Sequence, residues 1–206
     1  MKQPRDTVLP HSEKLLVIAC GMIAREVLAA KQQLGLDHLD LTCLPAEFHY
    51  YPDRIPPAMD TAIAKAKAEG YRHIFVGYAD CGTGGLLDKV CEKHGVERIE
   101  GPHCYSFLSG NERFEKTAEE DLTTFFLTDY LARHFDKLIW EGLGIAAHPE
   151  LLPLYFGNYT KLVYLAQTRD PGLEAKAQDA AARLGLDFEL RFTGYGELGL
   201  ALTARA

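Results

Sequence analysis

The sequence has no long hydrophobic run and no concentration of basic residues. No apolar stretch approaches the roughly eighteen residues that cross a membrane, and residues 1–14 lack the apolar centre of a secretory signal. The net charge is −7 and the Lys and Arg residues are scattered, which argues against nucleic acid or an anionic membrane as a partner. We therefore expect a cytoplasmic protein that acts on a small molecule.

Several short motifs are also missing. The glycine-rich turn at residues 82–85 does not match GxGxxG and lacks the Lys and the Ser or Thr of a P-loop, so a nucleotide site there would depend only on a helix N-terminus. The chain has no CxxC pair, so no zinc-finger template applies. Five cysteines are an odd number, and no export signal accompanies them. A disulfide framework is therefore a weaker interpretation than metal, redox or packing roles.

The composition is that of a globular protein, with 47% hydrophobic and 25% charged residues. A chain of 206 residues can fill one core, and no linker or internal repeat divides it. We predict a single α/β domain over residues 1–206, with residues 1–13 as a polar N-terminal tail.

Short apolar runs alternate with segments of helical periodicity. Strands are expected at residues 15–19, 39–44, 73–77, 96–100, 161–166 and 187–192, and helices at 22–34, 58–69, 86–94 and 171–184. This alternation predicts a doubly wound, mainly parallel sheet of about 5–6 strands with helices on both faces, a Rossmann-like arrangement. Residues 103–157 are less regular, and there the run 125–127 is expected inside a longer helix ending near Trp140.

Three cysteines stand where predicted strands give way to helices: Cys20, Cys81 and Cys104. The carboxyl ends of parallel strands share one edge of a sheet, so these thiols are expected to meet there. Three thiolates suit zinc or an iron–sulfur cluster with one free iron, and His49 or His103 would be the fourth ligand. Cys43 and Cys91 are assigned to packing. A helix following Cys81 would direct its first N–H groups toward that thiol.

Other polar residues follow the same strands. Asp80 or His49 is expected to move protons in catalysis. Two aromatic stretches, 155–160 and 191–196, either hydrogen-bond a substrate or cap the sheet edge. The residues expected to bind the substrate are Gly82, Thr83, Gly84, Gly85, Asn158, Tyr159, Gln167 and Tyr195.

The chain also resembles a known family, the bacterial and archaeal domain of unknown function 1638. The resemblance runs over most of the sequence, and its motifs are Ala19-Cys20-Gly21, Leu44-Pro45-Ala46 with His49, Asp80 to Gly85, Gly101 to Tyr105, Phe125 to Asp129, Tyr155 to Tyr159 and Thr193 to Gly196. It implies a role beside corrinoid-dependent methyltransferases for methylated amines, within one-carbon metabolism, but identifies no reaction.

Three functions remain open. The first is a metal-dependent enzyme, with zinc or iron/iron–sulfur, acting on a small polar molecule. The second is a non-catalytic accessory protein that handles a metal or corrinoid, or docks on a methyltransferase. The third is a metal-free hydrolase or transferase in which Cys81 attacks and His49 or His103 is the base. A homo-oligomer is compatible with each of them.

Overall fold

A computed structural model of the chain describes residues 9–205. The chain forms two compact units, which we treat separately. The first unit contains Met1–His103 and Leu198–Ala206, and the second contains Cys104–Glu197. Of the predicted N-terminal tail, residues 1–8 lie outside the described part, and His11–Glu13 form a short 3-10 helix, η1.

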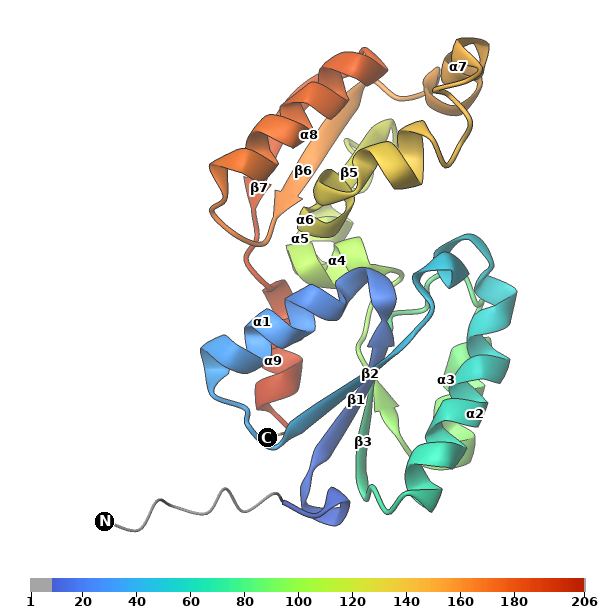
Figure 1. Ribbon diagram of the computed structural model, residues 1–206, viewed down its shortest axis with the longest axis vertical. Helices are drawn as coiled ribbons and strands as arrows, with labels where there is room; N and C mark the ends of the chain where they lie inside the picture. Colours follow the sequence, from blue (N-terminus) through green and yellow to red (C-terminus); the bar gives the residue numbers. More distant parts are fainter. Residues whose placement is uncertain (1–8, 206) are drawn as a thin grey trace. The chain divides into compact units, whose positions relative to one another are not determined.

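The first unit is built on a parallel four-stranded sheet with the order β2-β1-β3-β4 (Figure 1). Its strands are β1 (Leu15–Cys20), β2 (Leu39–Leu44), β3 (His73–Gly77) and the short β4 (Glu97–Arg98). The central β1 pairs with β2 on one side and with β3 on the other, and β3 also pairs with β4. All three pairings are parallel. β1 reads as a continuous apolar run because both of its faces are covered.

Helices cover both faces of this sheet. Figure 1 shows α1 (Ala24–Leu34) and α9 (Gly196–Thr203) along one face, and α2 (Ile55–Ala68) and α3 (Leu86–His94) along the other. Short 3-10 turns η2 (Gly21–Ile23), η3 (Ala46–Tyr50) and η4 (Pro52–Arg54) follow β1 and β2 at their carboxyl ends. From Leu198 onward α9 belongs to the first unit, so the second unit is an insertion in its sequence.

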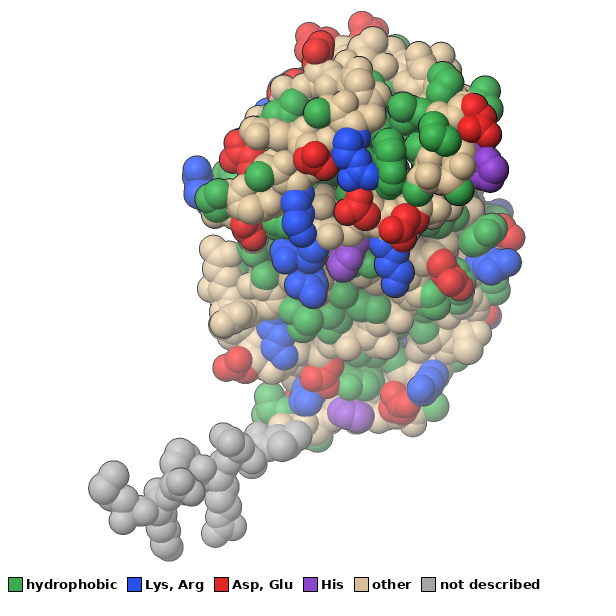
Figure 2. Space-filling model, turned by 45° about the horizontal axis from the view of Figure 1, so that its top comes forward, with side chains coloured by type: hydrophobic (Ala, Val, Ile, Leu, Met, Phe, Trp, Pro, Cys, Tyr) green, Lys and Arg blue, Asp and Glu red, His purple; other side chains and the backbone are tan. Residues whose placement is uncertain are grey.

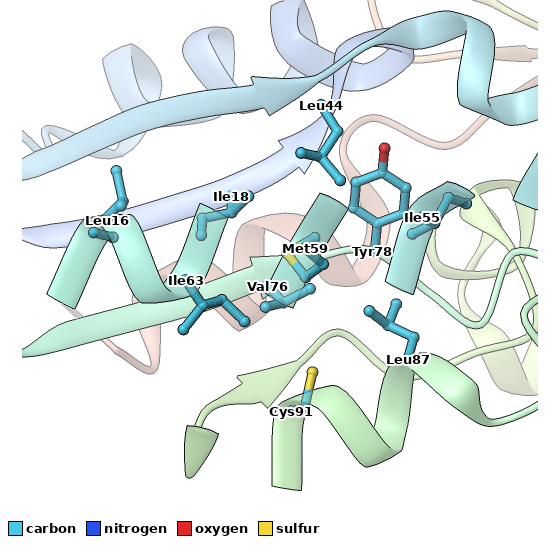
Figure 3. Packing of buried hydrophobic residues seen from close by; sticks show 11 residues of the cluster. Leu16, Ile18, Leu44, Ile55, Met59, Ile63, Val76, Tyr78, Leu87 and Cys91 are labelled. Atoms are coloured by element: carbon cyan, nitrogen blue, oxygen red, sulfur yellow. The ribbon is translucent and has the colours of Figure 1, made fainter. Parts of the chain in front are cut away.

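The core between the sheet and the α2–α3 layer positions the carboxyl ends of β1 and β3. Figure 3 shows Ile18 of β1 and Val76 of β3 facing Met59 and Ile63 of α2, with Leu87 of α3 completing the layer. These five side chains have no more than trace exposure. Burial of this kind contributes about 1.5–3 kcal/mol for each large aliphatic side chain.

The second unit contains a separate three-stranded parallel sheet with the order β5-β6-β7. Its strands are β5 (Thr124–Thr128), β6 (Lys161–Ala166) and β7 (Asp187–Phe192). The helical elements of the unit are α4 (Cys104–Ser109), α5 (Asn111–Lys116), α6 (Asp129–Arg133), the π-helical turn η5 (Asp136–Trp140), η6 (Pro149–Leu151), α7 (Leu152–Phe156) and α8 (Pro171–Leu184).

A buried carboxylate ties the carboxyl ends of β5 and β6 together. Asp129 accepts hydrogen bonds from the Tyr164 hydroxyl at 2.7 Å, from the Gln167 N–H at 3.0 Å and from both the N–H and the hydroxyl of Thr168. The amide side chain of Gln167 accepts from the Asp129 N–H at 2.8 Å. These reciprocal bonds satisfy a charge that would otherwise be costly to bury.

The α/β class and the parallel pairing are confirmed, but the prediction of one sheet of 5–6 strands was wrong. The described strands divide into a sheet of four and a sheet of three. Residues 125–127 were expected in a helix and instead lie in β5, with Phe125 packed edge-on against Phe156 and Phe126 stacked on Tyr105. The prediction of a single domain stays a prediction, because each of the two compact units is considered separately.

The described helices include none that is long and apolar enough to cross a membrane. On the face shown in Figure 2, acidic and basic side chains stand beside one another and are interspersed with hydrophobic ones.

Candidate functional site

The carboxyl edge of the first sheet contains the point where the chain changes direction across the sheet. The chain runs from β1 to β2 on one side and then crosses to β3 on the other side of β1. In open parallel sheets, ligands bind in the crevice outside the strand ends at this switch point. Cys20 is the last residue of β1, and Cys81 follows β3 by four residues. Both therefore flank the crevice that topology favours.

Cys81 has an unusual backbone. Its φ of 50° is the only left-handed value among the described non-glycine residues, and Gly82, Gly84 and Gly85 also have positive φ values. A side chain in this region costs about 1–3 kcal/mol, and such residues cluster at functional sites. The turn therefore holds the Cys81 backbone in a conformation that local energetics oppose.

Asp80 holds this turn in place. Its carboxylate accepts hydrogen bonds from the Thr83 hydroxyl at 2.9 Å, from the Gly85 N–H at 2.8 Å and from the Gly84 N–H at 3.2 Å. Partial burial alone would raise the pKa of Asp80, but these hydrogen bonds outweigh it and lower the pKa below 3.8. Asp80 is therefore a carboxylate near neutral pH, and the predicted proton transfer competes with its function in the turn.

The same bonds change the expectation for Cys81. α3 begins only at Leu86, and the N–H groups of Gly84 and Gly85 that precede it donate to Asp80. The helix start is thus satisfied by a carboxylate, so it is not the source of thiolate stabilisation that the sequence suggested. A side chain near Cys81 is therefore the candidate for its activation.

His103 is placed beside Cys81 by the backbone. The Asp80 N–H donates to the Gly101 carbonyl at 3.0 Å, and the Cys81 N–H donates to the Pro102 carbonyl at 2.8 Å. These bonds extend the pairing of β3 with β4 past the end of the strands. The residue after Pro102, His103, therefore lies alongside the Cys81 turn.

His49 reaches the same region from η3, after β2. Desolvation lowers the pKa of both imidazoles, and for His103 the neighbouring His49 lowers it further. The His49 ring keeps exposed surface, but the protein around it still weakens its hydration. Both rings are thus neutral at pH 7, the form that accepts a proton or binds a metal.

The sequence interpretation missed Tyr78, which lies between the cysteines of this edge. Tyr78 is 2% exposed and packs with Cys20 and Cys81 in one cluster, where Figure 3 shows its hydroxyl directed away from Met59. Burial raises its pKa well above 10, and Cys20, Cys81 and Cys43 add to this effect. A tyrosine just past Gly77, at a strand end, was the signal available in the sequence.

Cys43 was assigned to packing, yet it is exposed and lies one register step from Cys20, opposite Ala19. Burial raises the pKa of Cys20, an effect that interaction with the Tyr78 hydroxyl partly offsets. Burial and the nearby Cys20 also raise the pKa of Cys43. Both residues are therefore thiols at neutral pH.

Cys104 begins α4 in the second unit, so the convergence of Cys20, Cys81 and Cys104 stays a prediction. Between residues 9 and 205, no three His, Cys, Asp or Glu side chains gather in an arrangement that would hold a metal ion.

The residues predicted to bind substrate fall in different places. Thr83 is buried and bonded to Asp80, and Gly82 to Gly85 form the turn itself. In the second unit, Gln167 and Tyr195 follow β6 and β7 at their carboxyl ends. Asn158 and Tyr159 instead precede β6, and Tyr159 packs on Phe125. They lie at the opposite edge of that sheet from Gln167, and the shared substrate site of the whole set stays a prediction.

A cavity of about 380 Å³ lies at the amino edge of the first sheet, away from the cysteines. Leu15 and His73, the first residues of β1 and β3, line it together with Lys67, Arg72 and Arg205. Glu97 also lines the cavity and forms an ion pair with Arg205, and the basic residues here have a structural cause. Helices α2 and α3 both end here, where their exposed carbonyls carry partial negative charge, and Lys67 donates to the His94 carbonyl at the end of α3.

Comparison with known proteins identifies the family. The model of the family described as "Protein of unknown function (DUF1638)" matches residues 43–202, and the chain belongs to this family. The match includes His49, Cys81, His103 and Cys104, and it begins after Cys20. Neither a curated protein nor a solved structure matches the chain.

Proposed function

We propose that this member of the DUF1638 family is an enzyme that acts on a small polar molecule through a cysteine nucleophile, Cys81. The observation that supports it most is the strained Cys81 turn at the switch point, next to two imidazoles that are neutral at pH 7.

The chemistry is that of an activated thiol. His103 accepts the proton of the Cys81 thiol as the sulfur attacks an electrophilic carbon, and it returns that proton to the leaving group. The lowered pKa values keep both His103 and His49 in the base form. Because a second charge near His103 is unfavourable, only one of the two rings takes up the proton at a time.

Thiol alkylation tests the proposal without knowledge of the substrate. Iodoacetamide, followed by peptide mass spectrometry, compares the rate at Cys81 with the rate at the exposed Cys43 in the same molecule. We expect Cys81 to react at least tenfold faster, and His103→Gln to remove this advantage, since a general base contributes about 10²–10⁴-fold. Cys91→Ser, in the buried position on α3, is the control that leaves the rate unchanged. Equal rates at Cys43 and Cys81 in the native protein would reject the nucleophile.

A metal-dependent enzyme is the second candidate. Its support is that Cys20, Cys81, His49 and His103 belong to one sheet edge and include the thiol and neutral imidazole groups that zinc prefers. Zinc or an iron–sulfur cluster on Cys20, Cys81 and Cys104 predicts about one equivalent of zinc, or iron with sulfide, in protein purified without oxygen. Loss of that metal on Cys81→Ser supports this candidate, and metal-free protein with a reactive Cys81 excludes it.

A non-catalytic accessory protein in a corrinoid methyltransferase system is a third proposal, based only on the family resemblance. It predicts saturable binding of a corrinoid or of the methyltransferase without turnover.

A further inference from the structure

Tyr78 has a buried hydroxyl group whose nearby partner is the weakly accepting thiol of Cys20. Its oxygen has less than 1 Å² of exposed surface and no hydrogen-bond partner of regular geometry among the described residues, and the Cys20 thiol beside it is a poor partner. An unsatisfied buried hydroxyl costs about 1–3 kcal/mol. Such a group calls for an explanation, because native proteins rarely retain one.

A second buried tyrosine in the same chain has a hydroxyl with a regular hydrogen-bond partner. Tyr164 is 1% exposed, and its hydroxyl donates to Asp129 at 2.7 Å. Tyr164 lies within β6, whereas Tyr78 directly follows β3. A buried tyrosine of this chain can therefore have a hydrogen-bond partner of regular geometry, which Tyr78 lacks.

The position of the Tyr78 hydroxyl narrows the identity of the absent partner. Tyr78 packs in the same cluster as Cys20 and Cys81, the two cysteines that flank the switch point. Since its pKa is raised well above 10, the hydroxyl keeps its proton and acts as a donor. An acceptor atom that reaches it would lie against these thiols, within the site assigned to the Cys81 reaction.

We infer that Tyr78 donates a hydrogen bond to the carbonyl oxygen of an acyl substrate, such as an ester, thioester or amide, that Cys81 attacks. This inference rests on the proposed function. As the Cys81 sulfur bonds to the carbonyl carbon, the C=O π electrons move to the oxygen, and His103 takes the thiol proton. The oxyanion accepts the Tyr78 hydrogen bond. It then re-forms the C=O bond and expels the leaving group, which His103 protonates where its basicity requires.

Two reagents separate a contact with the oxygen from an effect on the thiol. p-Nitrophenyl acetate acylates a thiol through an oxyanion, whereas iodoacetamide alkylates it by direct displacement. We expect Tyr78→Phe to slow acetylation of Cys81 by about 10²-fold, the usual loss for one oxyanion donor. Alkylation of Cys81 should stay within about twofold of the native rate, because displacement of iodide creates no oxyanion.

Stability measurements on a matched pair exclude a structural explanation. Tyr78→Phe removes a hydroxyl that lacks a regular partner, so the urea midpoint should not fall. Tyr164→Phe, which removes one of the hydrogen bonds to the buried Asp129 carboxylate, should lower it. Slowing of both reactions by Tyr78→Phe, or of neither, overturns the inference while leaving Cys81 as nucleophile. Acetylation that persists unchanged in Cys81→Ser, with mass spectrometry showing no label at Cys81 in the native chain, instead rejects the proposed function itself.

Discussion

Replacement of Asp80 tests whether its carboxylate holds the Cys81 turn. Asp80→Ala removes the acceptor of three hydrogen bonds, those of Thr83, Gly84 and Gly85. Water can replace the bond to the exposed Gly84 but not fully the one to the buried Thr83 hydroxyl. A hydrogen bond to a charged group contributes about 1.5–3 kcal/mol, and partial exposure reduces this, so we expect a loss of about 2–4 kcal/mol. Asp80→Asn keeps one acceptor oxygen and should cost about half as much.

The pH dependence follows from the lowered pKa of Asp80. The folded protein binds the Asp80 proton more weakly than the unfolded chain does, so the stabilisation is complete above the ordinary pKa of 3.8. It is lost as the pH falls through the lower, folded pKa. The difference in stability between the native protein and Asp80→Asn should therefore shrink below about pH 4.

Urea unfolding followed by far-ultraviolet circular dichroism measures both effects, at pH 7 and at acid pH. Asp187→Ala, at an exposed position that starts β7, is the matched control and should change stability by less than about 0.5 kcal/mol. An Asp80→Ala variant as stable as this control would refute the assignment of Asp80 as the residue that holds the turn.

Three further changes test the packing of the two units by urea or thermal unfolding. Leu87→Ala, at a fully buried position, should lower the free energy of unfolding by about 2–5 kcal/mol. Leu86→Ala, at the neighbouring position that is 51% exposed, should lower it by under about 1 kcal/mol, and equal losses would contradict the orientation of α3. Asp129→Ala should cost about 3–5 kcal/mol, because it strands buried donors, and a loss below about 1 kcal/mol would contradict the network. Gly196→Ala places a Cβ 2.3 Å from the Phe107 carbonyl oxygen and should destabilise the protein far more than Gly194→Ala. Gly194 has a similar φ but open space around the Cβ position, so equal effects would exclude the close approach of Gly196 to Phe107.

Local sequence signals predicted the regular parts of the chain well. The strands at 39–44, 73–77, 161–166 and 187–192 are confirmed, as are the helices at 86–94 and 171–184. The strands at 73–77 and 161–166 contain continuous apolar runs, those at 39–44 and 187–192 alternate apolar and polar residues, and a glycine ends each of the two helices. β5 was missed because its apolar residues face two covered sides, so it shows no alternation, and a short apolar run does not distinguish strand from helix.

The division into two sheets depends on pairing partners, which periodicity does not reveal. Alternating strands and helices predict parallel pairs but not which strands share a sheet. The same limit applies to the site. Strand-end positions led to Cys20, Cys81, His49 and His103, whereas the turn-holding bonds of Asp80 depend on the φ values of residues 81–85, which the sequence does not display.

The return of α9 to the first unit determines when that unit can be completed. Leu198 and Leu202 are fully buried, yet they follow the whole second unit in the chain. During synthesis β1, which ends at Cys20, emerges before the second unit, but α9, which covers one face of the same sheet, emerges after it. The second unit is therefore complete before the first has all the helices that cover its sheet.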